Sequence, residues 1–192
     1  MSSSDGWDAR WLPSPNFDPR PGGEPPSLII IHAISLPPDE FGGPGVEQLF
    51  TNRLDPTEHP YYATIHALRV SAHFFIRRNG EVVQFVSTDD RAWHAGVSCW
   101  EGRERCNDFS IGIELEGCDT QPFEEVQYRQ LAGLVAALRS RYPIDAIAGH
   151  SDVAPGRKTD PGPCFDWERL RALLDGGVGM KWACFDKDQR NQ

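Results

Sequence analysis

The sequence predicts a single mixed α/β domain in which a central β-sheet is flanked by helices. Its length of 192 residues, with 39% hydrophobic and 24% charged residues, is typical of one globular domain. Several short segments rich in β-branched or aromatic residues have the pattern of strands, and longer segments have the pattern of amphipathic helices. These elements do not alternate strictly, which favours a mixed sheet over the doubly wound sheet of nucleotide-binding folds.

Five segments are predicted to be strands because they are short, rich in β-branched or aromatic residues, and bounded by turn residues. They are residues 27–34, 72–78, 81–87, 110–117 and, with the weakest pattern, 144–149. The dipeptide Asn79-Gly80 separates the second and third of these segments. Asn-Gly between two strand patterns is the strongest short signal for a β-hairpin, so these two strands are expected to pair with each other.

The clearest helix is expected over residues 124–142, where Pro143 stops it. Its apolar residues recur every three or four positions: Leu131, Leu134, Val135, Leu138 and Tyr142. This helix should therefore lie across the sheet. A second helix is expected to begin at Asp166, a good N-cap, and to end at Gly176-Gly177. Residues 46–50 are a candidate for a further short helix.

Three other segments complete the predicted organisation. Residues 35–71 are rich in proline, glycine and aromatic residues, and a loop of this length inside a compact domain is usually functional. Residues 1–26 are polar and proline-rich, and they are expected to pack as an extended segment on the domain of residues 27–175. Residues 176–192 show no sustained periodicity and are expected to form a flexible C-terminal tail.

Charge and composition argue against several classes of partner. The formal net charge of −9 would repel phosphate backbones and anionic lipids, so neither nucleic acid nor a membrane is expected to bind. No long apolar run and no export signal are evident, which predicts a soluble protein of the cytoplasm. The protein is expected to be a monomer. The five cysteines include no CxxC pair and are expected to be reduced thiols without a chemical role.

Two histidines and one aspartate follow predicted strands. His32 ends the most apolar strand, His150 follows the strand over 144–149, and Asp160 comes one short loop later. Two imidazoles and a carboxylate form a plausible catalytic zinc set, because three protein ligands leave a fourth position for water. Spacing alone does not establish that the three meet, since they are far apart and lack an HExxH motif. A lone histidine at a strand end is more often a hydrogen-bonded core residue.

Glu114 and Lys158 are candidates for proton transfer and charge stabilisation. Alternation along 110–117 places Ile111, Ile113 and Leu115 on one face of the strand, and Glu114 and Glu116 on the other. Gly112 leaves room beside Glu114, which could take a proton from water and pass it to a leaving amine. Lys158 lies two residues before Asp160 and could stabilise an oxyanion. The alternatives are a solvated strand face and an ordinary surface lysine.

Further residues have the chemistry of a substrate-binding surface. The run Trp93-His94-Ala95-Gly96 suits a surface that packs against sugar or peptide. Arg69 and Arg105 could pair with substrate carboxylates through bidentate contacts, although exposed arginines are common. The remaining histidines are expected to be structural or surface residues: His59, His66, His73 and His94.

The segments taken together resemble the AmpD family, the bacterial 1,6-anhydro-N-acetylmuramyl-L-alanine amidases, within the wider zinc amidase and peptidoglycan-recognition fold. The resemblance extends from about residue 11 to residue 174. Its most specific motifs are EFGG, RAWHAGVS, RCNDFSIGIELEG and RKTDPG at residues 40–43, 91–98, 105–117 and 157–162. Shorter matches lie at residues 13–17, 34–38, 54–56, 59–61 and 70–73.

The resemblance implies a zinc amidase domain over residues 27–175 and a role in cell-wall recycling. The implied reaction is hydrolysis of the amide between (1,6-anhydro-)N-acetylmuramic acid and L-alanine, with an anhydromuropeptide or muropeptide as substrate. It implies Zn²⁺ on His32, His150 and Asp160, with Glu114 as the acid/base and Lys158 as the transition-state stabiliser. It also implies a substrate groove, with residues 35–71 forming one wall, and four further residues close to the groove: Tyr61, Arg69, Trp93 and Arg105.

One position departs from the pattern of the family. Where the family usually reads His-Asn-Ile-Ser, this chain reads His32-Ala33-Ile34-Ser35. The side-chain amide expected to contact the substrate is therefore absent at Ala33. Loss of one such hydrogen bond costs roughly 0.5–1.5 kcal/mol of substrate or transition-state binding, a factor of about 2 to 13 in rate, so activity is expected to be weakened and not abolished.

Three other functions are compatible with parts of the pattern. The first is an exported or phage-type amidase that attacks intact cell walls. The second is a peptidoglycan-binding module without catalysis, which would be expected if a metal ligand had been replaced. The third is a structural zinc ion, which usually has four protein ligands and so is disfavoured by a set of three.

Overall fold

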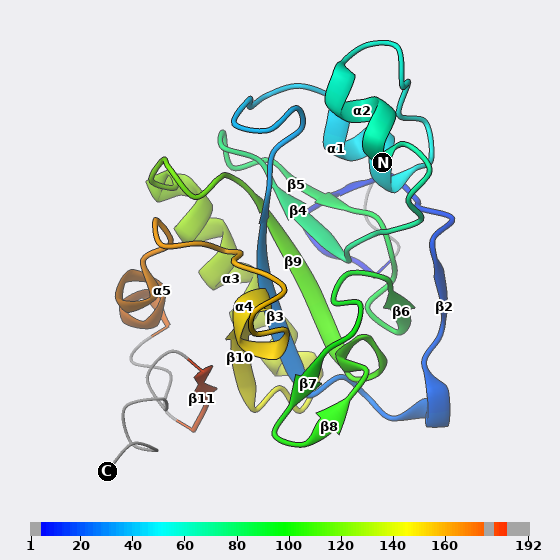
Figure 1. The fold of residues 1–192 in the computed structure, drawn as a ribbon. Coiled ribbons are helices and arrows are strands. Elements are labelled where there is room, and N and C mark those ends of the chain that lie inside the picture. Colours follow the sequence, from blue (N-terminus) through cyan, green and yellow to red (C-terminus); the bar gives the residue numbers. More distant parts are fainter. Residues whose placement is uncertain (1–4, 175–178, 184–192) are drawn as a thin grey trace.

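A seven-stranded mixed sheet forms the centre of the computed structural model, which describes residues 5–174 and 179–183 (Figure 1). The strand order is β1-β5-β4-β9-β3-β10-β11, and every neighbouring pair is parallel except β4 and β5. The strands are β1 (Arg10–Trp11), β5 (Val82–Gln84), β4 (Phe74–Ile76), β9 (Ser110–Glu116), β3 (Leu28–Ile34), β10 (Ala146–Gly149) and β11 (Lys181–Trp182). The predicted class, one mixed α/β domain, is confirmed.

All five predicted strands are present, with shorter bounds, as β3, β4, β5, β9 and β10. The hairpin predicted at Asn79-Gly80 joins β4 to β5, which pair antiparallel. Gly80 adopts a φ of +88°, a value that residues with a side chain rarely adopt. The Asn79 side chain accepts a hydrogen bond from the Glu81 amide, which closes the turn.

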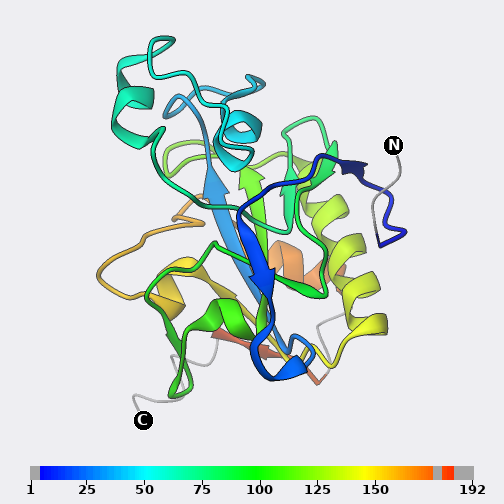
Figure 2. The same ribbon diagram turned by 90° about the vertical axis from the view of Figure 1, so that its right-hand side faces the viewer.

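Helix α3 (Glu125–Arg141) covers one face of the sheet, as Figure 2 shows. Its buried residues Leu131, Val135 and Leu138 belong to the same apolar cluster as Ile29 and Ile31 of β3. On β9, the members of this cluster are the alternate residues predicted to face the core: Ile111, Ile113 and Leu115. The alternate apolar residues of the strands and the apolar residues spaced three or four apart on α3 therefore pack together in one core.

Helix α5 (Trp167–Leu173) packs beside α3. As predicted, Asp166 is its N-cap, and the carboxylate accepts a hydrogen bond from the Arg169 amide at 2.9 Å. Leu170 is fully buried in the same apolar cluster. The predicted helix end at Gly176-Gly177 lies outside the described residues.

The predicted long loop over 35–71 contains two short helices, which Figure 2 shows beyond the ends of the central strands. Helix α1 (Gly45–Phe50) matches the short helix expected over 46–50 and packs Phe50 edge-on against Phe85, with ring centroids 5.1 Å apart. Helix α2 (Pro60–Ile65) was not predicted. Its start is visible in the sequence in retrospect, because His59 caps it and Pro60 occupies the first turn.

Besides α2, β1 and β11, the described residues form seven short elements that the sequence did not predict. They are β2 (Phe17–Pro19), β6 (Asp90–Ala92), β7 (Cys99–Trp100), β8 (Arg103–Glu104), the 3-10 turns η1 (Pro21–Gly23) and η2 (Cys106–Asp108), and α4 (His150–Val153). The β2 and β6 strands pair antiparallel, and so do β7 and β8. Two to four residues are too few for either hydrophobic period to become visible.

The two ends of the described chain both contribute a strand to the central sheet. Residues 5–26 include β1, and the Asp5 carboxylate accepts a hydrogen bond from the Thr88 amide at 2.8 Å. Within the segment 176–192, which was predicted to be a flexible tail, the described residues 179–183 include β11, which pairs with β10 and buries Trp182. Residues 175–178 and 184–192 lie outside the described residues.

Two expectations drawn from composition can be compared with the described part of the chain. Within residues 5–174 and 179–183, no helix is both long enough and apolar enough to cross a membrane. Four of the cysteines are free thiols there, and Cys184 lies outside the described residues.

Candidate active site

The candidate site lies where three parallel strands end at one edge of the sheet. His32 lies near the end of β3 and is paired in register with Glu114 of β9. β10 pairs with β3 on the other side, and His150 follows its last residue, Gly149, directly. The three strands lie side by side (Figure 1), and because parallel strands share one direction, their carboxyl ends lie at the same edge of the sheet. Alternation turns His32 and Glu114 to the face opposite α3.

Three side-chain atoms converge at this edge. The Nδ1 atoms of His32 and His150 lie 3.0 Å apart, and the Oδ2 atom of Asp160 lies 3.1 Å from the first and 3.0 Å from the second. Tetrahedral zinc, with bonds of about 2.0–2.1 Å, separates neighbouring ligand atoms by about 3.3 Å. The triangle is therefore close to the size that such an ion requires. Among the described residues, this is the one group of donors with metal-binding spacing.

The protonation states of these groups also suit a metal. Burial lowers the pKa of His32 to about 4, because the charged imidazolium is costly to bury. Burial would raise the pKa of Asp160, but hydrogen bonds with His150 and His32 outweigh it and hold the pKa below the ordinary value. At neutral pH the set therefore offers a neutral His32 imidazole and an ionised carboxylate, the forms that ligate metals.

The Glu114 side chain is buried beside this triangle. Its Oε2 atom makes no hydrogen bond with any described residue. Burial raises the pKa of Glu114 well above its usual value, and the nearby charge of Asp160 raises it further. A buried carboxyl group without a partner destabilises a fold, and such groups concentrate at functional sites.

A cavity of about 660 Å³ opens over these residues. It is lined by all five residues that were predicted to bind the metal, transfer protons or stabilise charge: His32, Glu114, His150, Lys158 and Asp160. Lys158 is exposed at the cavity wall, in the loop that carries Asp160. The segment from Ile34 to Asp39 contributes to another wall, in agreement with the expectation that part of residues 35–71 borders a groove.

Three of the five residues predicted to contact substrate also line the cavity: Ala33, Tyr61 and Trp93. Tyr61 projects from α2, and Trp93 follows β6 directly. Ala33 is half-buried and also packs against the apolar cluster beneath α3.

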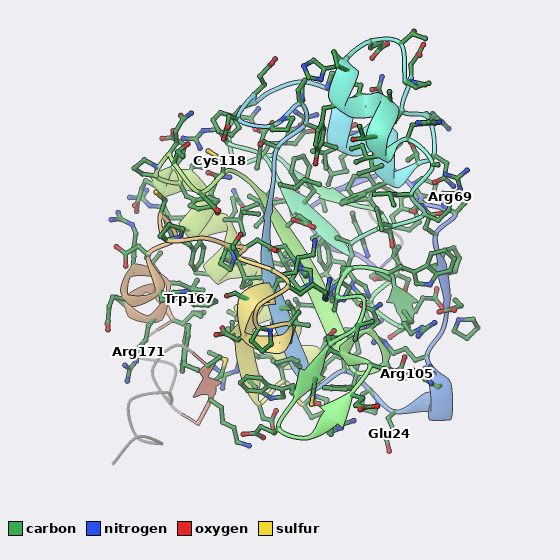
Figure 3. The ribbon with its side chains drawn as sticks, viewed as in Figure 1. Glu24, Arg69, Arg105, Cys118, Trp167 and Arg171 are labelled. Atoms are coloured by element: carbon green, nitrogen blue, oxygen red, sulfur yellow. The ribbon has the colours of Figure 1, made fainter. Side chains whose placement is uncertain are left out.

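Arg69 and Arg105 do not line this cavity. Arg69 donates hydrogen bonds to the carbonyl groups of His66 and Leu68 just after α2. Arg105 pairs with Asp108 at 3.1 Å. In the view of Figure 3, both arginines lie toward one side of the molecule, whereas Cys118, which lines the cavity, lies toward the other. Their contact with a substrate stays a prediction.

Glu116 has a structural role, in contrast to its neighbour on the strand face, Glu114. It shares a strand face with Glu114, but both of its carboxylate oxygens are occupied. Oε1 accepts a hydrogen bond from the Gly42 amide, and Oε2 accepts one from the Arg78 amide at 3.0 Å. Glu116 therefore fastens the residues near Gly42 to the sheet.

Sequence reasoning missed Arg157 among the residues of the cavity wall. Its Nη2 atom donates hydrogen bonds to the carbonyl groups of Ala95 and Val97, at 2.7 and 2.6 Å. This joins the loop of Lys158 and Asp160 to the segment that follows Trp93. Nothing in the spacing of the sequence predicts this contact, because it links two loops that are far apart along the chain.

Comparisons with known proteins agree with this geometry. Residues 22–163 match the family model described as N-acetylmuramoyl-L-alanine amidase. The 1,6-anhydro-N-acetylmuramyl-L-alanine amidase AmpD of Citrobacter freundii is 60% identical over 178 residues, which cover 91% of this chain and 95% of that protein.

Two solved structures extend the comparison. A crystal structure of a selenomethionine AmpD derivative is 60% identical in sequence and has a TM-score of 0.87. The match covers 91% of this chain and 99% of the AmpD chain. The amidase AmiD from Escherichia coli is 31% identical with a TM-score of 0.58, over 80% of this chain and 59% of AmiD. It was solved with the substrate anhydro-N-acetylmuramic acid-L-Ala-D-γ-Glu-L-Lys. The chain described here belongs to the N-acetylmuramoyl-L-alanine amidase family and, within it, to the AmpD group.

Proposed function

We propose that this chain is a zinc-dependent amidase that hydrolyses the bond between (1,6-anhydro-)N-acetylmuramic acid and L-alanine in peptidoglycan fragments, during cell-wall recycling. The observation that carries the proposal is the convergence of three donor atoms within 3.1 Å of one another, beside the buried carboxyl group of Glu114. The names of the AmpD relatives and the ligand of AmiD support the substrate class. The proposal keeps the monomer and the cytoplasmic setting expected from the sequence.

The chemistry of the donor set supports zinc as the metal. Two imidazole nitrogens and one carboxylate oxygen are typical of catalytic zinc sites with three protein ligands. The proposed ligands are Nδ1 of His32, Nδ1 of His150 and Oδ2 of Asp160. When bound, zinc supplies a Lewis acid that polarises a carbonyl group and makes water nucleophilic near neutral pH.

The residues around the ligands supply the other steps. Glu114 accepts a proton from the attacking water and returns it to the amine of L-alanine as the amide bond breaks. Its buried position and raised pKa favour the protonated carboxyl group that this second transfer requires. Lys158 lines the same cavity, and its positive charge is proposed to stabilise the oxyanion of the tetrahedral intermediate.

The cavity walls have the composition of a sugar and peptide site. Tyr61 and Trp93 present aromatic rings to a cavity large enough for a small ligand. Arg69 and Arg105 are proposed to attract the carboxylates of the stem peptide from outside the cavity. At Ala33, the absence of the amide found in the family weakens binding of the substrate or the transition state.

The substitution Asp160→Ala tests the proposal as a whole. It removes one of three ligands, so the variant is expected to lose both bound zinc and turnover of anhydromuropeptide. Zinc content is measured by elemental mass spectrometry, and product release by chromatography. Asp8→Ala, which removes an exposed carboxylate that does not line the cavity, is the control and should change neither. Full activity in a zinc-free Asp160→Ala preparation would sink the proposal. A wild-type protein that holds muropeptide intact would indicate a binding module instead.

The substitution Glu114→Gln tests the proton-transfer role. Glutamine keeps the shape of the side chain but cannot accept the proton, so turnover should fall by about 10²- to 10⁴-fold while zinc content stays unchanged. Glu116→Gln is a matched control on the same strand face, and its turnover should remain near that of the wild type. Equal turnover in Glu114→Gln and the wild type rules out Glu114 as the acid/base.

The substitution Ala33→Asn tests the departure from the family pattern. One restored hydrogen bond of roughly 0.5–1.5 kcal/mol should raise kcat/KM for anhydromuropeptide by a factor of about 2 to 13. Ala33→Leu adds a side chain of similar volume without an amide and is the control. If both variants change kcat/KM to the same extent, an amide at this position does not stabilise the substrate or the transition state.

A further inference from the structure

Two consecutive residues contact the outer nitrogen atoms of both histidine ligands. The Nε2 atom of His150 lies 3.0 Å from the carbonyl oxygen of Ala95. The Nε2 atom of His32 lies 2.9 Å from Nδ1 of His94. Each imidazole therefore has Nδ1 turned to the metal triangle and Nε2 turned to the segment His94-Ala95.

We propose that His94 is a positioning residue for the metal site, which sets the tautomer and the ring orientation of His32. The inference rests on the proposed function, because it assigns His32 as a metal ligand. A ligating histidine usually donates its second N–H group to a carboxylate or a carbonyl group. The acceptor for His150 is the Ala95 carbonyl group, whereas the acceptor for His32 is the imidazole of His94.

The order of donors and acceptors is fixed by the ligand role. Nδ1 of His32 must be unprotonated to bind a metal, so the proton of the neutral ring is on Nε2 and is donated to Nδ1 of His94. His94 then carries its own proton on Nε2, which donates to the Ser110 hydroxyl at 3.3 Å. With the opposite tautomer, His94 would donate to His32 and drive the proton of His32 onto Nδ1, which would block the ligand atom.

The surroundings hold the His94 ring in one place. It packs edge-on against His32 and His73, with centroids 5.1 and 5.7 Å away. A Cβ atom added at Gly112 would lie 2.4 Å from Cγ of His94. The room that the sequence indicated beside Glu114 is therefore filled by the His94 ring, and this explains why residue 112 is a glycine.

The backbone of His94 and Ala95 is fixed by side chains from two other segments. Oδ1 of Asn107 accepts hydrogen bonds from the amides of His94 and Ala95, at 3.2 and 2.8 Å. Arg157 donates to the Ala95 carbonyl at 2.7 Å, beside the contact from His150. The segment is thus held by η2 on one side and by the loop of Asp160 on the other.

Two substitutions separate the hydrogen bond from the volume of the side chain. His94→Leu removes the acceptor, and the affinity for Zn²⁺ alone, measured by competition with a chromophoric chelator, should fall 10- to 100-fold. His94→Asn places an acceptor oxygen at the δ position and should recover most of this loss. Thermal unfolding of the zinc-free proteins checks that both variants fold. Zinc affinity of folded His94→Leu within twofold of the wild type would overturn the inference.

A measurement on the wild-type protein keeps the inference testable even if a variant fails to fold. In ¹⁵N NMR spectra of histidine-labelled protein, His32 and His94 should both be neutral and protonated at Nε2. A proton on Nδ1 of His94 would overturn the inference. A wild type that binds zinc with these tautomers but releases no product would refute the proposed function alone. Full turnover with undiminished zinc affinity in His94→Leu would refute the positioning role alone.

Discussion

The parallel pairing of β10, β3 and β9 is the constraint on which the rest of the structure depends. In this register His32 of β3 lies directly beside Glu114 of the neighbouring strand β9. His150 follows β10, the neighbour of β3 on its other side, at the same edge of the sheet. The same alternation places Ile31 and Ile113 under α3, on the opposite face. A slip of one residue would exchange these faces, burying the donors in the apolar core and exposing its isoleucines. The same strand register therefore determines both the burial of the core and the assembly of the site.

Much of the fold could be predicted because its central elements have clear periods. The apolar run of β3, the alternation of β9 and the three- and four-residue spacing of α3 each identify one element and its buried face. Short elements escaped this reasoning. The strand β11 has only two residues, and it forms because β10 offers an open edge, which is a property of the sheet and not of the local sequence.

The candidate site was predictable in its residue types but not in its convergence. Ligand chemistry identified His32, His150 and Asp160, yet only long-range pairing and the family resemblance indicated that they meet. The roles of Asn107 and Arg157 depend on contacts between loops, which no local pattern encodes. The same contacts fix the segment His94-Ala95, which contacts the outer nitrogen atoms of both imidazoles, whereas the sequence related this segment to a substrate surface and predicted only a structural or surface role for His94.

The central claim is that this edge of the sheet performs metal-dependent hydrolysis of the amide between muramic acid and L-alanine. Mass spectrometry of the products from an anhydromuropeptide mixture, with and without a chelator, tests it most directly. The account predicts that the protein releases the sugar and a free stem peptide that begins with L-alanine, that chelation stops this release, and that added Zn²⁺ restores it. Release of the same products by protein shown to contain no metal would contradict it.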